Sequence, residues 1–309
     1  MQKKETGIMN DKSMDRIDWN QLWKELINEG TRQRKNTTSE FWDNFAPTFR
    51  KKPKDGEKDE YIEKFYEYME IEPGETIFDM GCASGTLAIP YAQRGHEVYA
   101  ADFAPRMLEV LMQNAEEERV ADKIHPIQLD WNEDWSKRDL PVCDVAIASR
   151  SLIFEDLTSS LKKLESVAKR RICVGAWDTP TPGFDRYVSK AIGYERPGLA
   201  THSIIMGELL SRDVCPEMLV IKSPFRLARY ESFEAGVETL RKSFYGGLSE
   251  EQDQRLAEYC QEHMVKKTGE GYVSSRGDGQ ELEEYWQLDH SDMSTMGFIR
   301  WDKKFVCKL

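Results

Sequence analysis

A glycine-containing turn between a short apolar stretch and a helix-like stretch constrains the fold of this chain more than any other feature. The turn has the sequence Asp79-Met-Gly81-Cys-Ala-Ser-Gly85 and follows the strand-like residues 75–79. Glycines in such a turn permit positive φ angles and let the backbone approach a ligand closely. The free amides at the start of the following helix attract polar or anionic groups. The turn therefore predicts a ligand site at the end of a strand.

Strand-like and helix-like stretches alternate around this turn, from residue 70 to about residue 178. Strands are expected at 75–79, 97–102, 124–130, 143–149 and 171–177. Helices are expected at 86–94, 105–119 and 156–169. This alternation is typical of βαβ units. We therefore predict an α/β fold with a mostly parallel sheet.

Four segments are expected along the chain. Helical patterns predict an N-terminal helical lid over residues 1–58, followed by the α/β core at 59–180. Residues 181–284 contain few strand-like runs and are too long for an ordinary crossover, so we predict a mostly helical cap. Residues 285–309 are expected to complete the core sheet, with strand-like runs near 284–288 and 296–302.

The charge balance disfavours several classes of partner. The chain has 43 Lys and Arg against 55 Asp and Glu, a net charge of −12, which is unfavourable for binding a phosphate backbone. It has no apolar run of about 18 residues and no apolar N-terminal segment typical of a signal peptide. Its six cysteines form no CxxC pair. We therefore expect no nucleic acid, no membrane, reduced thiols, a cytoplasmic location and no metal.

A second aspartate strengthens the prediction of a ligand site. Asp102 ends the next predicted strand, where a carboxylate can accept hydrogen bonds from a ribose diol. A nicotinamide-binding turn normally has the spacing G-x-G-x-x-G, whereas this turn has Ala83 inside a G-x-x-x-G spacing. Asp79, two residues before Gly81, would face a cationic group. These features suit a ligand with an α-amino group and a sulfonium better than a dinucleotide.

In these residues the chain resembles the class I S-adenosylmethionine-dependent methyltransferases. The matching sequence is IFDMGCASGTLAIPYAQRGHEVYAADFAPRML at residues 77–108, with further matches at 129–131 and 146–152. The departure is Ala83, where the family often has glycine. The resemblance implies a Rossmann-like, doubly wound sheet, S-adenosylmethionine as the cofactor and an enzyme that transfers its methyl group.

The resemblance also implies roles for particular residues. Asp79 would hold the methionine ammonium, and Asp102 would hold the ribose hydroxyls with Phe103 beside the adenine. Asp130 would accept from the adenine amino group, and Trp131 would flank the ring unless it is a plain core aromatic. Trp42 and Phe49 would also contact the cofactor if their segment folds over it as a lid; the alternative is an ordinary packed helix. The remaining expected cofactor contacts are Gly81, Cys82, Ala83, Gly85, Met107, Ser149 and Arg150.

The sequence says less about the methyl acceptor and the catalytic residues than about the cofactor. Methyl transfer mostly requires orientation, and a general base is needed only when the nucleophile must lose a proton. The candidate bases are Glu155, Asp178 and His202. Aromatic and cationic side chains that could contact an anionic or aromatic substrate are Tyr187, Tyr194, Arg196 and His202.

These features favour methyl transfer from S-adenosylmethionine to a small-molecule acceptor. The fourth strand ends in Ser149-Arg-Ser-Leu and lacks the Asn/Asp-Pro-Pro-aromatic pattern used on planar amides and nucleobase amines. The alternatives are a protein or RNA methyltransferase, or a non-catalytic S-adenosylmethionine-binding regulatory module. A homodimer remains open, as do the acceptor and its reacting atom.

Overall fold

The computed structural model describes ten stretches of the chain. They are residues 17–31, 38–46, 60–152, 154–177, 185–194, 201–224, 228–244, 247–272, 281–291 and 293–303. Three residues with expected roles, Phe49, Asp178 and Arg196, lie outside the described residues.

Seven strands form one sheet in the order β3-β2-β1-β4-β5-β9-β6. The strands are β1 (Ile77–Met80), β2 (Val98–Asp102), β3 (Ile124–Gln128), β4 (Cys143–Ser149), β5 (Ala168–Trp177), β6 (Glu217–Pro224) and β9 (Met293–Asp302). The first five are parallel, whereas β9 runs antiparallel to both β5 and β6. The strand order reverses between β1 and β4, and ligands bind at such a point in open α/β sheets. The predicted Rossmann-like fold class is confirmed.

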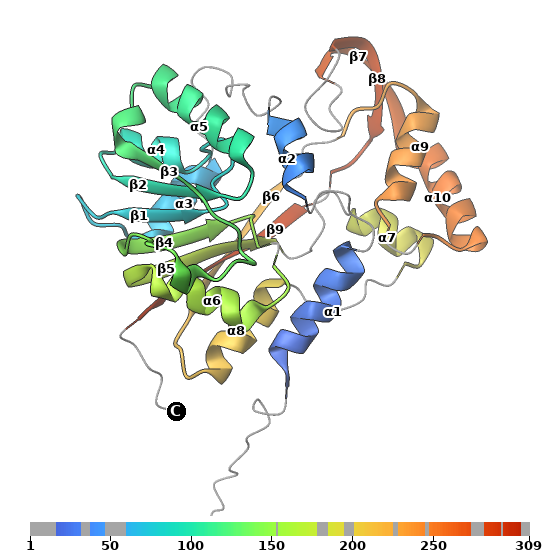
Figure 1. Cartoon of the computed structure of the whole chain (residues 1–309). Coiled ribbons are helices and arrows are strands. Elements are labelled where there is room, and N and C mark those ends of the chain that lie inside the picture. The colour runs from blue at the N-terminus through green and yellow to red at the C-terminus, as the bar shows by residue number, and fades with distance from the viewer. Residues whose placement is uncertain are drawn as a thin grey trace, which may run out of the picture.

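Helices cover both faces of this sheet (Figure 1). Successive strand residues point to opposite faces, so Ile77 lies in one hydrophobic cluster and Phe78 in the other. The Ile77 face packs against α3 (Glu60–Met69), α4 (Ala88–Gln93) and α5 (Pro105–Glu117). The Phe78 face packs against α1 (Trp19–Thr31), α6 (Leu157–Ser166) and α8 (Thr201–Ser211). Among the described residues, single-turn 3₁₀ helices lie at Ala121–Lys123 and Trp135–Lys137.

A second hydrophobic unit, which we call the cap, lies to the right of the sheet in Figure 1. Its buried residues, among them Val188, Leu240 and Leu256, form a cluster of their own. The cap consists of α7 (Arg186–Ile192), α9 (Phe233–Lys242), α10 (Glu250–His263), β7 (Met264–Tyr272) and β8 (Glu281–Leu288). β7 and β8 pair as a separate antiparallel sheet.

The predicted division after residue 180 needs two corrections. Within 181–284, α8 packs on the core sheet and β6 forms its edge strand, so this segment is not a cap throughout. The strand expected near 284–288 is β8, which pairs with β7 in the cap instead of completing the core sheet. An apolar strand pattern shows that a segment is extended, but the strand it pairs with depends on distant parts of the chain.

The two helices described in the predicted N-terminal lid belong to different parts of the fold. Helix α1 belongs to the core layer, because the buried Trp23 Nε1 donates to the Phe154 carbonyl at 2.9 Å. Helix α2 (Ser39–Phe45) instead lies against the start of α5, where Asp43 Oδ1 accepts a hydrogen bond from the Arg106 amide at 2.9 Å. Of the two helices described in this part of the chain, α2 is the one that occupies a position suited to a lid.

The described part of the chain includes five of the six cysteines. Cys82, Cys143, Cys173 and Cys260 are free and buried. Cys215 is bonded in a disulfide, so the expectation of reduced thiols is wrong for that residue. No helix in the described segments combines the length and apolar character needed to cross a bilayer.

Candidate functional site

The turn after β1 is pinned to the neighbouring strand. The amides of Gly81 and Cys82 both donate to the Ala101 carbonyl, at 2.7 and 3.0 Å. Gly81 has a φ of +78°, and a Cβ there would overlap the Ser151 side chain. The predicted need for glycine at this position has two causes, the left-handed backbone and the close approach of Ser151.

The second half of the turn has the same requirement. Gly85 has a φ of +96°, and an added Cβ would lie 2.5 Å from Leu111 Cδ1 and 2.8 Å from Ile89 Cδ1. Ala83 is also left-handed, at +47°, a conformation that non-glycine residues adopt mainly where the surroundings impose it. Glycine at positions 81 and 85 therefore lets the turn pack closely against neighbouring side chains at the carboxyl end of β1.

Asp79 is the unusual residue of this site. Its side chain is only 2% exposed, and Oδ2 has no hydrogen-bond partner within the described residues. Burial, with a smaller contribution from the negative charge of Asp102, raises the pKa of Asp79 to about 7. An unpartnered buried carboxylate is costly, so this position favours a ligand that donates hydrogen bonds and carries positive charge.

Asp102 connects the turn to the second strand. Its Oδ2 accepts from the Ala83 amide at 2.9 Å, and its Oδ1 accepts from the Ala104 amide at 3.0 Å. Burial raises the pKa of Asp102, while these backbone donors act in the opposite direction. Each oxygen keeps a further lone pair, so the carboxylate can still accept from two neighbouring hydroxyls.

A small apolar cluster joins α2 to this edge of the sheet. Ala46, Ala104, Met107 and Val110 are buried together, and Trp42 and Ala83 pack against them. Met107 is therefore a packing residue that seats α2 beside the turn. Phe103, between Asp102 and Ala104, is half-buried.

The two residues predicted to contact adenine have different surroundings. Asp130 Oδ1 accepts from the Asn132 amide at 2.8 Å and from its side-chain nitrogen at 3.1 Å. Trp131 is buried, stacks on Trp135 with ring centroids 5.4 Å apart, and donates from Nε1 to the Ser151 carbonyl at 3.0 Å. This position agrees with the alternative in which Trp131 is a plain aromatic residue of the core.

The end of β4 carries a group of contacts that the sequence analysis missed. The Tyr61 hydroxyl, from α3, hydrogen-bonds to Ser149 Oγ, and the Arg150 guanidinium lies 4.3 Å from the Tyr61 ring centroid. Arg150 is left-handed, with a φ of +57°. Burial raises the pKa of Tyr61, and the charge of Arg150 opposes that shift. No local pattern in the sequence indicates that Tyr61 approaches Ser149.

The candidate bases differ in position. Glu155 is exposed in the loop between β4 and α6. His202 packs against Gly297 of β9, and its neighbour Thr201 donates from Oγ1 to the carbonyl of Trp177, the last residue of β5. The Thr201 contact places His202 beside the carboxyl end of β5.

The candidate substrate residues do not share one element. Tyr187 is 55% exposed on α7, and Tyr194 packs on Phe244 in the cap with ring centroids 5.0 Å apart. His202 instead belongs to α8 in the core layer.

Comparison with known proteins connects this geometry to a family. A family model described as "Methyltransferase domain" matches residues 77–171, from β1 into β5. An uncharacterised protein of Haemophilus influenzae is 30% identical over 201 residues, which are 65% of this chain and 73% of that protein. The chain belongs to the class I S-adenosylmethionine-dependent methyltransferases.

Three further similarities cover different shares of the chain. The ribosomal protein L11 methyltransferase of Burkholderia thailandensis is 30% identical over 129 residues, 41% of this chain and 42% of that protein. A structure from Bacillus halodurans C-125, described as a candidate methyltransferase, has 15% identity and a TM-score of 0.49, covering 79% of this chain and 99% of the other. The geranyl diphosphate C-methyltransferase of Streptomyces coelicolor A3(2) has 13% identity and a TM-score of 0.41, covering 79% and 75%.

This methyltransferase therefore uses S-adenosylmethionine as its cofactor. Two observations show that the residues present fit it. Asp79 Oδ2 lacks a partner within the described segments, and the methionine ammonium is a cationic donor of the required kind. The Asp102 carboxylate is held by the Ala83 and Ala104 amides and keeps lone pairs that can accept from the ribose hydroxyls.

Proposed function

We propose that this methyltransferase transfers the methyl group of S-adenosylmethionine to a small-molecule acceptor at the carboxyl ends of β1, β2 and β4. The observation that carries the proposal is the buried Asp79 carboxylate, whose Oδ2 has no partner among the described residues. A buried negative charge beside a left-handed turn is complementary to an ammonium and a sulfonium.

The residues of the turn would divide the cofactor between them. Asp79 would bind the methionine ammonium, and the backbone from Gly81 to Gly85 would line the methionine and the ribose. Asp102 would accept from the ribose hydroxyls, since the Ala83 and Ala104 amides hold its carboxylate in place. Phe103 would lie beside the adenine, and Asp130 would accept from its amino group.

The methyl group would be transferred near the end of β4. Ser149 and Arg150 would lie under the methionine, and their contacts with Tyr61 would hold them in place. Trp42 on α2 would help to keep water from the sulfonium, which matters because methyl transfer disperses positive charge. If the acceptor must lose a proton, His202 is the candidate base, given its position beside the end of β5.

Charge supports a small acceptor over a nucleic acid. The net charge of −12 opposes binding of a polyanion. The cap provides apolar and aromatic surface beyond the core sheet, including the exposed Tyr187. A molecule of limited size would contact such a surface without an extended basic groove.

The acceptor class can be tested with methyl-labelled S-adenosylmethionine. The full chain is incubated with a cell extract separated by dialysis into small-molecule and macromolecular fractions. We expect label to enter the dialysable fraction. Label in protein or RNA would contradict the proposal, and so would tight cofactor binding without labelling of either fraction, which would favour a regulatory module.

The cofactor site can be tested separately by calorimetry with S-adenosylhomocysteine. Asp102→Asn should weaken binding by about 1–3 kcal/mol, because hydrogen bonds to a charged acceptor are lost. Asp134→Asn is a matched control, since Asp134 also accepts from a nearby amide, that of Ser136 at 3.2 Å, but is exposed. Equal affinities of the two variants would remove Asp102 from the site.

A further inference from the structure

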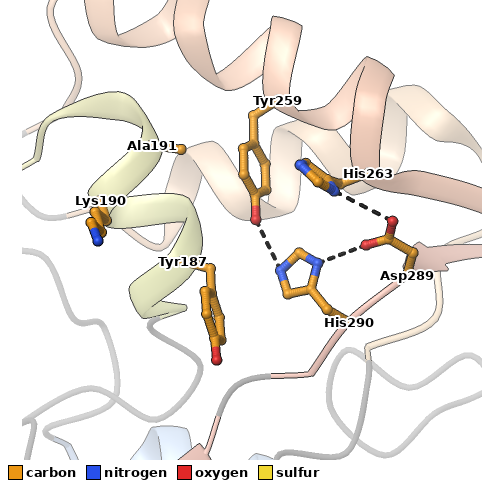
Figure 2. Close-up of a pocket in the computed structure, with 7 residues that line it drawn as sticks. All are labelled: Tyr187, Lys190, Ala191, Tyr259, His263, Asp289 and His290. Carbon is orange, nitrogen blue, oxygen red and sulfur yellow. Dashed lines mark hydrogen bonds and ion pairs between the residues drawn. The ribbon is translucent and has the colours of Figure 1, made fainter.

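We propose that His263, Asp289 and His290 form a binding site for a divalent transition-metal ion, with zinc the best match, in the cap. His263 is the last residue of α10, and Asp289 and His290 directly follow β8. Figure 2 shows the three side chains converging beside Tyr259. This site is separate from the cofactor turn and uses none of its residues.

The donor set and its spacing suit zinc. Two imidazoles and one carboxylate offer ligand atoms that all lie within 4.8 Å of one another. Zinc commonly takes His nitrogen and carboxylate oxygen at about 2.0–2.2 Å in tetrahedral geometry, which places neighbouring ligand atoms about 3.3–3.5 Å apart. His263 Nδ1 and Asp289 Oδ2 are 3.3 Å apart, whereas His290 Nδ1 and Asp289 Oδ1 are 2.7 Å apart and would have to separate slightly.

Backbone pairing brings the three residues together before any ion binds. Met264 pairs with Leu288 at the end of the β7–β8 ladder, and the Asp289 amide donates to the His263 carbonyl at 2.8 Å. The junction between α10 and β7 is thereby fixed against the residues that follow β8. An ion would have to order only side chains, which lowers the entropic cost of binding.

Tyr259 supports the orientation of both histidines. Its hydroxyl lies 2.9 Å from His290 Nε2, and its ring packs on the His263 ring with centroids 4.3 Å apart. A histidine that binds a metal through one nitrogen usually hydrogen-bonds through the other, and Tyr259 provides that partner for His290. His290 Nδ1 is therefore directed at Asp289, where the ion would lie.

The site opens into a cavity of about 640 Å³ between α7 and α10. Tyr187, Lys190 and Ala191 line the α7 side of this cavity, opposite the three ligands (Figure 2). The ligand side chains are partly exposed, at 30% for His263, 43% for Asp289 and 26% for His290. Three protein ligands leave a coordination position for water or an anionic molecule, which the Lys190 ammonium would attract.

This proposal departs from the expectation of no metal, which rested on ligand spacing in the sequence. His263 lies 26 residues before Asp289, and no short histidine or cysteine motif connects them. The hairpin formed by β7 and β8 places them together.

Equilibrium dialysis of the full chain against zinc tests the proposal. The protein is first stripped with a chelator and kept in a thiol-free reductant, and bound zinc is counted by atomic emission. We expect the wild-type chain to bind one more zinc ion than His263→Ala or His290→Ala. His125→Ala is the matched control, because His125 contacts a single carboxylate, Glu97, at 2.8 Å, and it should bind as the wild type does.

Asp289→Asn covers the case in which a histidine variant fails to fold. It keeps the size of the side chain but removes its charge, and we expect at least a tenfold weaker zinc affinity with an unchanged circular dichroism spectrum. Cobalt should give visible absorption bands in the wild type that disappear in Asp289→Asn. Equal zinc content and affinity in the wild type and Asp289→Asn would overturn the proposal. Zinc bound by cysteines would be the same in both proteins and does not affect this comparison. Binding of S-adenosylhomocysteine should be unchanged in this variant.

Discussion

At the scale of single residues, two features of the β1 turn carry a cost in free energy for the folded protein. Asp79 has a buried carboxylate whose Oδ2 lacks a partner in the described structure, and Gly85 has a left-handed backbone in a crowded position. The first creates a demand for a cation, and the second leaves no room for a side chain at position 85. Each leads to a prediction.

Cofactor binding should release a proton below pH 7. The pKa of Asp79 is raised to about 7 in the free protein, so the carboxyl is largely protonated at pH 6. An ammonium favours the charged form, and binding must therefore displace that proton. The affinity for S-adenosylhomocysteine should rise as the pH increases, by up to about tenfold per pH unit below 7, and level off above it.

Calorimetry at pH 6 in two buffers of different ionisation enthalpy measures this proton release directly. Asp79→Asn cannot release a proton at this position, so its binding enthalpy should not depend on the buffer through this group. If the wild type and Asp79→Asn show the same buffer dependence, Asp79 does not titrate on binding.

Gly85→Ala should destabilise the protein more than Gly95→Ala. The two glycines have nearly the same φ, +96° and +97°, but a Cβ at Gly85 would meet Leu111 and Ile89, whereas nothing lies within 4 Å at Gly95. The shared strain should cost about 1 kcal/mol, and overpacking should add about 1–3 kcal/mol at Gly85. Urea unfolding measures both, and equal losses would show that crowding is unimportant here.

At the scale of elements, α2 is the piece whose position matters most for the site. It has only seven residues and is held by Thr38 at its start, by the apolar cluster around Met107 and by the Asp43 contact with α5. Helices this short gain little stability from their own hydrogen bonds. Its docking therefore depends on these tertiary contacts.

Asp43→Ala should loosen α2 without unfolding the core. Loss of the hydrogen bond to the Arg106 amide removes about 0.5–1.5 kcal/mol. Amide hydrogen exchange should become faster in residues 39–46, and cofactor affinity should fall if α2 shields the sulfonium. Glu40→Ala on the exposed face of the same helix is the control and should leave exchange unchanged. Unaltered exchange in Asp43→Ala would mean that the apolar cluster alone holds the helix.

At the scale of the whole molecule, the chain has two hydrophobic units with different tasks. The core sheet with its two helical layers holds the residues proposed to bind the cofactor, and the cap has its own buried cluster and its own two-stranded sheet. Separate clusters allow separate local stabilities. The cap could therefore open while the core stays folded.

Leu256→Ala should test that separation. Leu256 is fully buried in the cap, and its truncation should cost about 2–5 kcal/mol. Hydrogen exchange should increase in α7, α9 and α10, while S-adenosylhomocysteine binding persists. Leu161→Ala, equally buried but in the core, should increase exchange around α6 and weaken cofactor binding. Loss of core protection in Leu256→Ala would show instead that the two units unfold together.

The sequence alone determined the features that depend on neighbouring residues. The strand, the glycines and the helix start around Gly81 are contiguous, so their chemistry and periodicity predicted β1, the turn and the parallel sheet. Asp79 and Asp102 were found for the same reason, since each ends a recognisable strand and parallel strands end at one edge.

Only the tertiary structure decided the features that depend on which distant segments meet. It places β6 rather than β8 in the core sheet, and the indole of Trp131 inside the core. It also brings Tyr61 to Ser149 and His263 to Asp289. The physical reason is the same in each case: an amphipathic pattern shows that a side chain will be buried, but its partner is selected by the packing of the whole chain.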